Sequence, residues 1–226
     1  MNHFARHALI SIVLLAGCGS PADDKRPVRL AGVCYRIPEW NAMPMDASPV
    51  WPGFGSRESG RSLSLQFSST EIARRLPGYP ASGAQPGQKL LAGFFVPTSS
   101  ERTERSSNER RMHLDIWYAL GDFQSRALEP IEGTDLLRIY PLPGGPTWMV
   151  VTRAPDVERR DTHLQDEFWI ATCSYMGPQQ VRNCSLDVDV GSFDVSLHIA
   201  EADLPLRHQL ASQAVQSLKA WQVPCD

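Results

Sequence analysis

Apolar and polar residues alternate along several short stretches of the chain, and most of these stretches stop at proline or glycine. A period of two residues is typical of strands that bury one face. The pattern predicts strands at Val28–Ile37, Leu63–Phe67, Lys89–Val96, Met112–Leu120, Leu136–Tyr140, Thr147–Arg153, Glu167–Cys173, Leu186–Val190 and Phe193–Ile199. Because short turns join many of these strands, antiparallel pairing is favoured over parallel pairing.

The last two strands form the clearest hairpin, joined by Gly191-Ser192, a pair suited to a type II′ turn. The resulting register turns three apolar pairs inward: Val190 with Phe193, Val188 with Val195, and Leu186 with Leu197. Four polar residues point outward: Asp187, Asp189, Asp194 and Ser196. Asp189 then faces Asp194, a repulsive pair that calcium, a cationic partner surface or screening by water would relieve.

Two helices are indicated. Ser68 and Glu71 stand at capping-box spacing, and Pro77-Gly78 ends the short helix that follows. A longer helix closes the chain, with Asp203 as its cap and Pro205 in its first turn. Its apolar residues recur at helical spacing: Leu206, Leu210, Ala214, Leu218 and Trp221. The predicted fold class is therefore α+β, a mainly antiparallel sheet of hairpins with a C-terminal helix packed on it.

The cysteines indicate an oxidising compartment. Besides Cys18, the chain has four: Cys34, Cys173, Cys184 and Cys225. Four cysteines allow three pairings. Their spacing favours Cys173 with Cys184 across a short loop, which leaves Cys34 and Cys225 to join the two ends of the fold. The chain has no C-x-x-C pair and no histidine at ligand spacing beside these cysteines, so we predict no metal site.

The N-terminus has basic residues at Arg6 and His7, an apolar run from Ala8 to Ala16, and then Leu15-Ala16-Gly17-Cys18. This stretch resembles the bacterial lipobox, which implies cleavage before Cys18 and lipid attachment there; an ordinary secretory signal is the alternative. The apolar run falls well short of the roughly 20 residues that span a bilayer. By the sorting rule of lipobox proteins, Gly19 implies the outer membrane, facing the periplasm, rather than the inner. We predict a lipoprotein signal at 1–17, a tether at 18–27 and a single α+β domain at 28–226.

Composition and motifs argue against several function classes. The net charge is −3 and the basic residues are scattered, so no nucleic-acid partner is expected. The common signatures of hydrolases, phosphate loops, dinucleotide folds and zinc proteases are absent. Four histidines lack a paired ligand and are expected at the surface: His113, His163, His198 and His208. A Ser-His-Asp site around His113 and Asp115 would lack a marked nucleophile. We therefore predict no catalysis and no cofactor.

A long loop from Asn41 to Gly60 has an unusual apolar content for a connection that faces solvent. It either covers an edge of the core or forms a partner-binding surface, because clustered aromatic residues dominate interface energetics. Combined with the acidic hairpin face, the candidate partner-binding residues are Trp40, Trp51, Phe54, Asp187, Asp189 and Asp194.

The chain begins its domain with Cys34-Tyr35-Arg36-Ile37-Pro38, and closes with a cysteine pair, a hairpin and a helix that ends in Leu218-Lys219-Ala220-Trp221. These two ends resemble periplasmic immunity lipoproteins encoded beside antibacterial secretion-system toxins, whereas Met43 to Gln165 is unmatched. The resemblance implies a lipid-anchored protein that binds and inhibits a cognate toxin; it assigns no toxin-binding residue. The alternatives are a structural lipoprotein of an envelope or secretion assembly and an envelope hydrolase.

Overall fold

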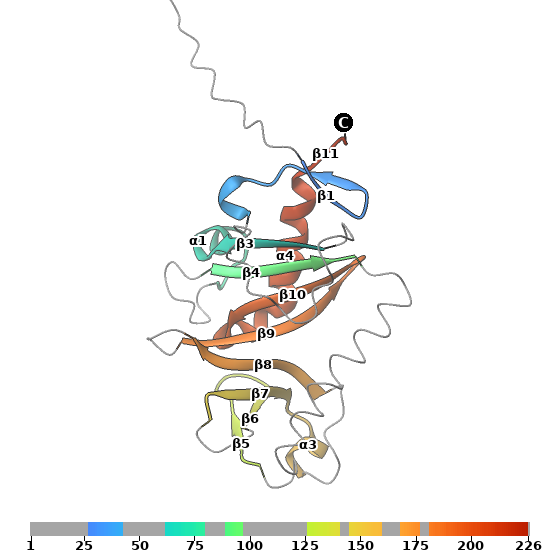
Figure 1. Ribbon diagram of the computed structural model, residues 1–226. Coiled ribbons are helices and arrows are strands. Elements are labelled where there is room, and N and C mark those ends of the chain that lie inside the picture. Colours follow the sequence, from blue (N-terminus) through green and yellow to red (C-terminus); the bar gives the residue numbers. More distant parts are fainter. Residues whose placement is uncertain are drawn as a thin grey trace, which may run out of the picture.

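The computed structural model describes residues 27–42, 62–79, 89–96, 126–140, 145–159, 168–176 and 181–225. Their strands form a large sheet in the order β3-β4-β10-β9-β8-β7-β6-β5 and a small sheet in the order β1-β2-β11 (Figure 1). The strands of the large sheet are β3 Ser62–Ser68, β4 Lys89–Phe95, β5 Leu128–Pro130, β6 Leu136–Ile139, β7 Thr147–Thr152, β8 Trp169–Met176, β9 Val181–Val190 and β10 Phe193–Ala200. The small sheet contains β1 Val28–Leu30, β2 Val33–Tyr35 and β11 Gln222–Val223. All pairs among these strands are antiparallel, as predicted.

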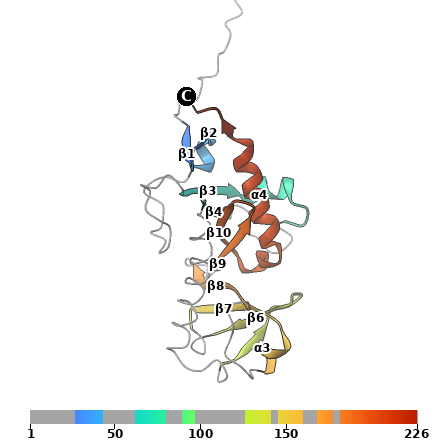
Figure 2. The ribbon, with the colours of Figure 1, turned by 90° about the vertical axis from the view of Figure 1, so that its right-hand side faces the viewer.

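Helices cover both faces of the large sheet. The α-helices are α1 Ser69–Arg75, α3 Pro155–Arg159 and α4 Arg207–Ala220, and the 3-10 helices include η1 Glu39–Asn41 and η6 Glu201–Leu206. The long C-terminal helix α4 lies along one face, against β9 and β10 (Figure 2). Leu197 of β10, Leu210 and Leu218 are all fully buried there. The α+β class and the packing of the C-terminal helix on the sheet are thus confirmed.

A second, smaller core lies on the other face, where β6 and β7 meet α3. It consists of Leu137, Ile139, Met149, Val151 and Val157. Among the described elements, no helix is long and apolar enough to cross a membrane.

The β9–β10 hairpin has the register predicted from its turn. Val190 lies opposite Phe193, and Asp189 lies opposite Asp194. Asp187 and Asp189 are exposed, but Asp194 is half-buried. Ser196 was expected to point into solvent and is instead buried; its hydroxyl donates a hydrogen bond to the Asp187 carboxylate.

The cap predicted at Ser68 is confirmed, whereas the Glu71 carboxylate accepts a hydrogen bond from Asn41. The Ser68 hydroxyl accepts a hydrogen bond from the Glu71 backbone N–H at 3.2 Å, and α1 ends directly before Leu76. This cap depends on residues only three positions apart, so the local sequence suffices to predict it.

The single strand predicted at Val28–Ile37 is wrong: the chain turns back at Ala31-Gly32 to form β1 and β2. Ala31 and Gly32 have φ values of 48° and 84°. Two consecutive residues with positive φ are characteristic of a type I′ hairpin turn, and glycine adopts the second conformation without steric cost.

Asp203 does not cap the C-terminal helix. It lies inside η6, with 1% of its surface exposed, whereas α4 begins at Arg207 after Leu206, which makes no side-chain cap. Its carboxylate forms a hydrogen bond with the Tyr79 hydroxyl instead. The pKa of Tyr79 is raised, mainly because the tyrosine is buried and also because of the charge and hydrogen bond of Asp203. Asp203 therefore interacts with Tyr79, which is distant in sequence, and not with the N-terminus of α4.

Both predicted disulfides are present. Cys173 and Cys184 lie directly opposite each other on β8 and β9, with their Cα atoms 4.0 Å apart. Cys34 of β2 is bonded to Cys225, just beyond β11, with a Cα separation of 5.3 Å. The Cys34–Cys225 bridge therefore joins the two ends of the described chain, and the Cys173–Cys184 bridge cross-links two neighbouring strands of the large sheet.

Several sequence predictions fall outside the described residues. These are the lipobox with Cys18, most of the Asn41–Gly60 loop with Trp51 and Phe54, the strand at Met112–Leu120 with His113 and Asp115, and His163. Conversely, β5, α3 and β11 are short elements that hydrophobic periodicity did not reveal.

Candidate partner-binding surface

The face of the large sheet opposite α4 carries polar residues on β3, β10 and β9. The register aligns Ser64 of β3, Gly93 of β4, Ser196 of β10 and Asp187 of β9 in one row across the strands. We call this surface the polar face and define it by Ser62, Ser64, Gln66, Ser185, Asp187, Asp189, Asp194, Ser196 and His198. It contains all three acidic residues selected from the sequence.

The acidic residues lie together near the β9–β10 turn. Asp187 accepts the Ser196 hydroxyl hydrogen bond, whereas Asp189 faces Asp194 across the hairpin. Within the described ranges, no group of three or more Asp, Glu, His or Cys side chains is placed to hold a metal ion. The surface therefore presents negative charge at two exposed positions, Asp187 and Asp189.

Next to the acidic residues, Ser185 Oγ lies 2.7 Å from His198 Nε2. Burial lowers the pKa of His198 to about 4, against the opposing effect of the Asp187 charge, so the imidazole is neutral at neutral pH. The prediction that His198 lies at the surface is wrong, because it is half-buried between β9 and β4. His208 is exposed, as predicted.

A serine bonded to a neutral histidine is the first requirement of a nucleophilic site. The second is a set of backbone N–H donors for the oxyanion. Ser185 lies in the middle of the sheet, paired with Thr172 on one side and His198 on the other, so strand neighbours flank its backbone on both sides. This geometry fits a hydrogen bond within the sheet better than an acyl-transfer site.

Trp40 lies at the rim of the polar face. Its side chain is 48% exposed, and its carbonyl accepts a 2.7 Å hydrogen bond from the Gln66 amide of β3. Asn41 is buried and donates to the Gln66 carbonyl at 3.0 Å and to Glu71 at 3.3 Å, which fixes η1 against β3. Strands lie about 4.8 Å apart, so β3, which Trp40 borders, is roughly 14 Å from β9. One protein partner is large enough to contact both.

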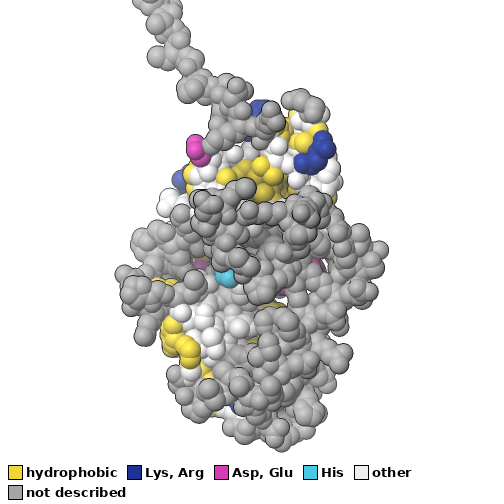
Figure 3. Space-filling view, viewed as in Figure 1, with side chains coloured by type: hydrophobic (Ala, Val, Ile, Leu, Met, Phe, Trp, Pro, Cys, Tyr) yellow, Lys and Arg dark blue, Asp and Glu magenta, His cyan; other side chains and the backbone are white. Residues whose placement is uncertain are grey.

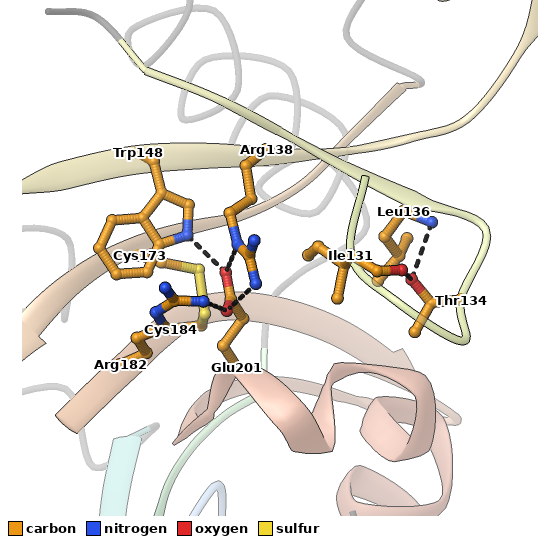
Figure 4. A network of polar contacts seen from close by, with 9 residues as sticks. All are labelled: Ile131, Thr134, Leu136, Arg138, Trp148, Cys173, Arg182, Cys184 and Glu201. Atoms are coloured by element: carbon orange, nitrogen blue, oxygen red, sulfur yellow. Dashed lines mark hydrogen bonds and ion pairs between the residues drawn. A yellow bond between two sulfur atoms is a disulfide. The ribbon is translucent and has the colours of Figure 1, made fainter. Parts of the chain in front are cut away.

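The sequence did not reveal a buried charge cluster around Glu201, which is 4% exposed (Figure 4). The Arg138 guanidinium donates to both carboxylate oxygens, at 2.7 and 2.8 Å. Trp148 Nε1 donates at 2.7 Å and Arg182 Nη1 at 3.3 Å. Burial acts to raise the pKa of Glu201, but the Arg138 hydrogen bonds and charge, with Trp148 and Arg182, hold it below its usual value.

This cluster connects η6 to β6, β7 and β9 beside the Cys173–Cys184 bridge. The ring of Trp148 also contacts Tyr175, with centroids 4.9 Å apart. The polar side chains of the cluster form hydrogen bonds with one another and come from four elements. We therefore interpret the cluster as structural. The only sequence signal for it is an arginine among the apolar positions of β6.

No protein-family model matches the sequence, and no curated protein is similar to it. Among solved structures, the chain is similar to an immunity protein of the Stenotrophomonas maltophilia type IV secretion system. The TM-score is 0.42 and the sequence identity 14%, over 88% of this chain and 93% of that one. At this level the likeness assigns no residue of a binding surface.

Proposed function

We propose that this protein is a lipid-anchored periplasmic immunity protein that binds a secreted antibacterial toxin and inhibits it without catalysis. The observation that carries the proposal is the polar face, on which exposed Asp187 and Asp189 stand on a strand paired on both sides. An anionic surface of this kind suits a basic cleft, because complementary charge accelerates association and selects the partner. The resemblance of the chain's two ends to immunity lipoproteins agrees with this role.

The polar face is preorganised. β9 is hydrogen-bonded to β10 on one side and to β8 on the other, and Cys173–Cys184 cross-links β8 to β9. A surface that is rigid before binding loses little conformational freedom when the partner docks. Trp40 at the rim adds the aromatic type of residue that often dominates binding energy. We further propose that Trp51 and Phe54 extend this surface.

Deleting the gene is expected to make the producing strain sensitive to its own siblings, because the incoming toxin then meets no inhibitor. A competition assay between the deletion strain and its parent measures this, and expression of the wild-type protein should restore survival. Unchanged survival would contradict the immunity role. A defect in envelope assembly with unchanged survival would instead favour the structural-lipoprotein alternative.

Replacing Asp187 and Asp189 with asparagine is expected to slow association with the toxin encoded next to this gene by about tenfold or more, because electrostatic steering is lost. Surface plasmon resonance at low and high salt measures the effect. The matched control is Glu132→Gln with Asp135→Asn, two exposed carboxylates in the β5–β6 turn that change the net charge equally. An equal loss in both variants would show that overall charge, and not the polar face, is responsible.

The proposed anchor is Cys18, with the outer membrane as its location. A Cys18→Ser chain is expected to carry no acyl chain and to be either uncleaved or processed elsewhere, because the thiol is the attachment point. Mass spectrometry and density-gradient fractionation measure both properties, and the wild type should sediment with outer membranes. Acylation that persists in Cys18→Ser would overturn the lipobox interpretation.

A further inference from the structure

The small sheet forms one end of the molecule, where the described chain begins and where Cys225 lies (Figures 1 and 2). Its inner face contributes Leu30 and Tyr35 to the core. Arg29 pairs with Cys34, and Arg36 follows Cys34 by two residues, so both arginines share the outer face with the disulfide. Both are exposed. The outward surface of this end therefore carries two cations, Arg29 on β1 and Arg36 directly after β2.

Further cations lie beside the small sheet. Arg75 Nη1 donates to Ser217 Oγ at 2.7 Å, which sets the last turn of α1 against the last turns of α4. Arg74, Arg75 and Lys219 are exposed there. We call these residues the basic end: Arg29, Arg36, Arg74, Arg75 and Lys219. Figure 3 shows Lys and Arg side chains around this part of the surface.

The acidic residues are distributed differently. Among the described side chains near the basic end, Glu39 is the exposed acid. The other exposed acids lie on β5, on the β5–β6 turn, on α3 and on β9: Glu129, Glu132, Asp135, Glu158, Asp187 and Asp189. Among the described residues away from the basic end, these exposed acids therefore outnumber the exposed cations, which are Arg153 and Arg182. Helix dipoles account for cations in the last turns of α1 and α4, but not for Arg29 in β1 or for Arg36 directly after β2.

We propose that the basic end docks on an anionic phospholipid surface and thereby orients the protein; this rests on the lipid anchor proposed above. The tether 18–27 spans at most about 35 Å when fully extended, so the first strand stays close to the bilayer. Each Lys or Arg near an anionic membrane contributes about fivefold to binding. Docking places the small sheet on the membrane, with β3 the nearest strand of the large sheet and β5 about 34 Å beyond β3, at seven strand spacings. Asp187 and Asp189 of β9 then remain exposed, three strand spacings beyond β3.

Vesicle binding tests the proposal without the acyl chains. The full mature chain with Cys18→Ser, exported by an ordinary signal, is mixed with vesicles of phosphatidylcholine with or without phosphatidylglycerol. We expect sedimentation with the phosphatidylglycerol vesicles, weakened by salt. Arg29→Gln with Arg36→Gln should reduce binding about 25-fold, the product of two fivefold losses. Equal binding to both vesicle types would overturn the proposal.

The matched control is Arg153→Gln with Arg207→Gln, which removes the same charge away from the basic end. Arg153 pairs with Glu158, and Arg207 begins α4, opposite Lys219. This variant should bind phosphatidylglycerol vesicles as strongly as the parent. If it loses as much binding as Arg29→Gln with Arg36→Gln, net charge explains the effect and the proposed docking surface is wrong.

Hydrogen exchange on the acylated wild-type protein provides a second measurement. Amides of β1 and β2 should exchange more slowly on vesicles with phosphatidylglycerol than on phosphatidylcholine alone, and Arg29→Gln with Arg36→Gln should remove the difference. Identical exchange on both vesicles would contradict docking. Failure of acylation or of sibling protection would count against the proposed function, whereas the vesicle assay would still decide the docking.

Discussion

Replacing Glu201 with glutamine is expected to lower the free energy of unfolding by about 3 to 5 kcal/mol, the usual cost of removing one partner of a buried ion pair. Glu201 is 4% exposed and accepts two charged hydrogen bonds from Arg138, whose side chain is 14% exposed. Glutamine offers one oxygen and no charge, so the Arg138 guanidinium loses the carboxylate that accepts its two hydrogen bonds. Urea unfolding with linear extrapolation measures the difference.

Glu158→Gln is the matched control. Glu158 pairs with Arg153 at 3.4 Å, but the two side chains are 53% and 38% exposed. Exposed pairs of this kind contribute about 0 to 1 kcal/mol. If the two substitutions cost the same, the cluster around Glu201 does not stabilise the fold as its geometry indicates.

The same substitution should change the acid sensitivity of the protein. Because the folded-state pKa of Glu201 lies below the usual value of 4.5, its stabilising contribution is complete above about that pH. The contribution is lost as the pH falls through the lower, folded-state pKa. The wild type should therefore lose more stability than Glu201→Gln on acidification below pH 4.5, and parallel curves would contradict this assignment.

Opening the terminal disulfide should have an effect of similar size. Cys34→Ser and Cys225→Ser are each expected to destabilise the protein by about 2 to 5 kcal/mol, and the double variant little more than either. The bridge joins residues 191 positions apart and therefore restricts almost the whole unfolded chain. It also fastens β11 and the end of α4 to β2.

Thermal unfolding of the three variants, with non-reducing peptide mapping of the parent, measures the contribution. Cys173→Ser is the comparison, because its bridge closes only 11 positions and the chain-entropy estimate is about 3 kcal/mol for such a loop, against roughly 5 for the longer one. Additive costs for Cys34→Ser and Cys225→Ser would show that each cysteine stabilises the fold separately from the bridge.

The sequence by itself determined the features that depend on neighbours along the chain. The Gly191-Ser192 turn and the alternation around it fixed the β9–β10 register, and Ser68 with Glu71 fixed the start of α1. The spacing of Cys173 and Cys184 fixed the nearer disulfide, and the other followed from it. The acidic part of the polar face was predictable for the same reason, because a period of two assigns every second residue to one face.

Only the tertiary structure decided which distant elements meet. Periodicity shows that a strand has a buried face but not which strand lies beside it, so the pairing of β4 with β10 was not predictable. Arg138 and Glu201 form an ion pair although they are 63 positions apart. Asp203, which was expected to cap the C-terminal helix, instead contacts Tyr79. Buried polar groups must find partners wherever packing brings them together, and that depends on the whole fold rather than on the local sequence.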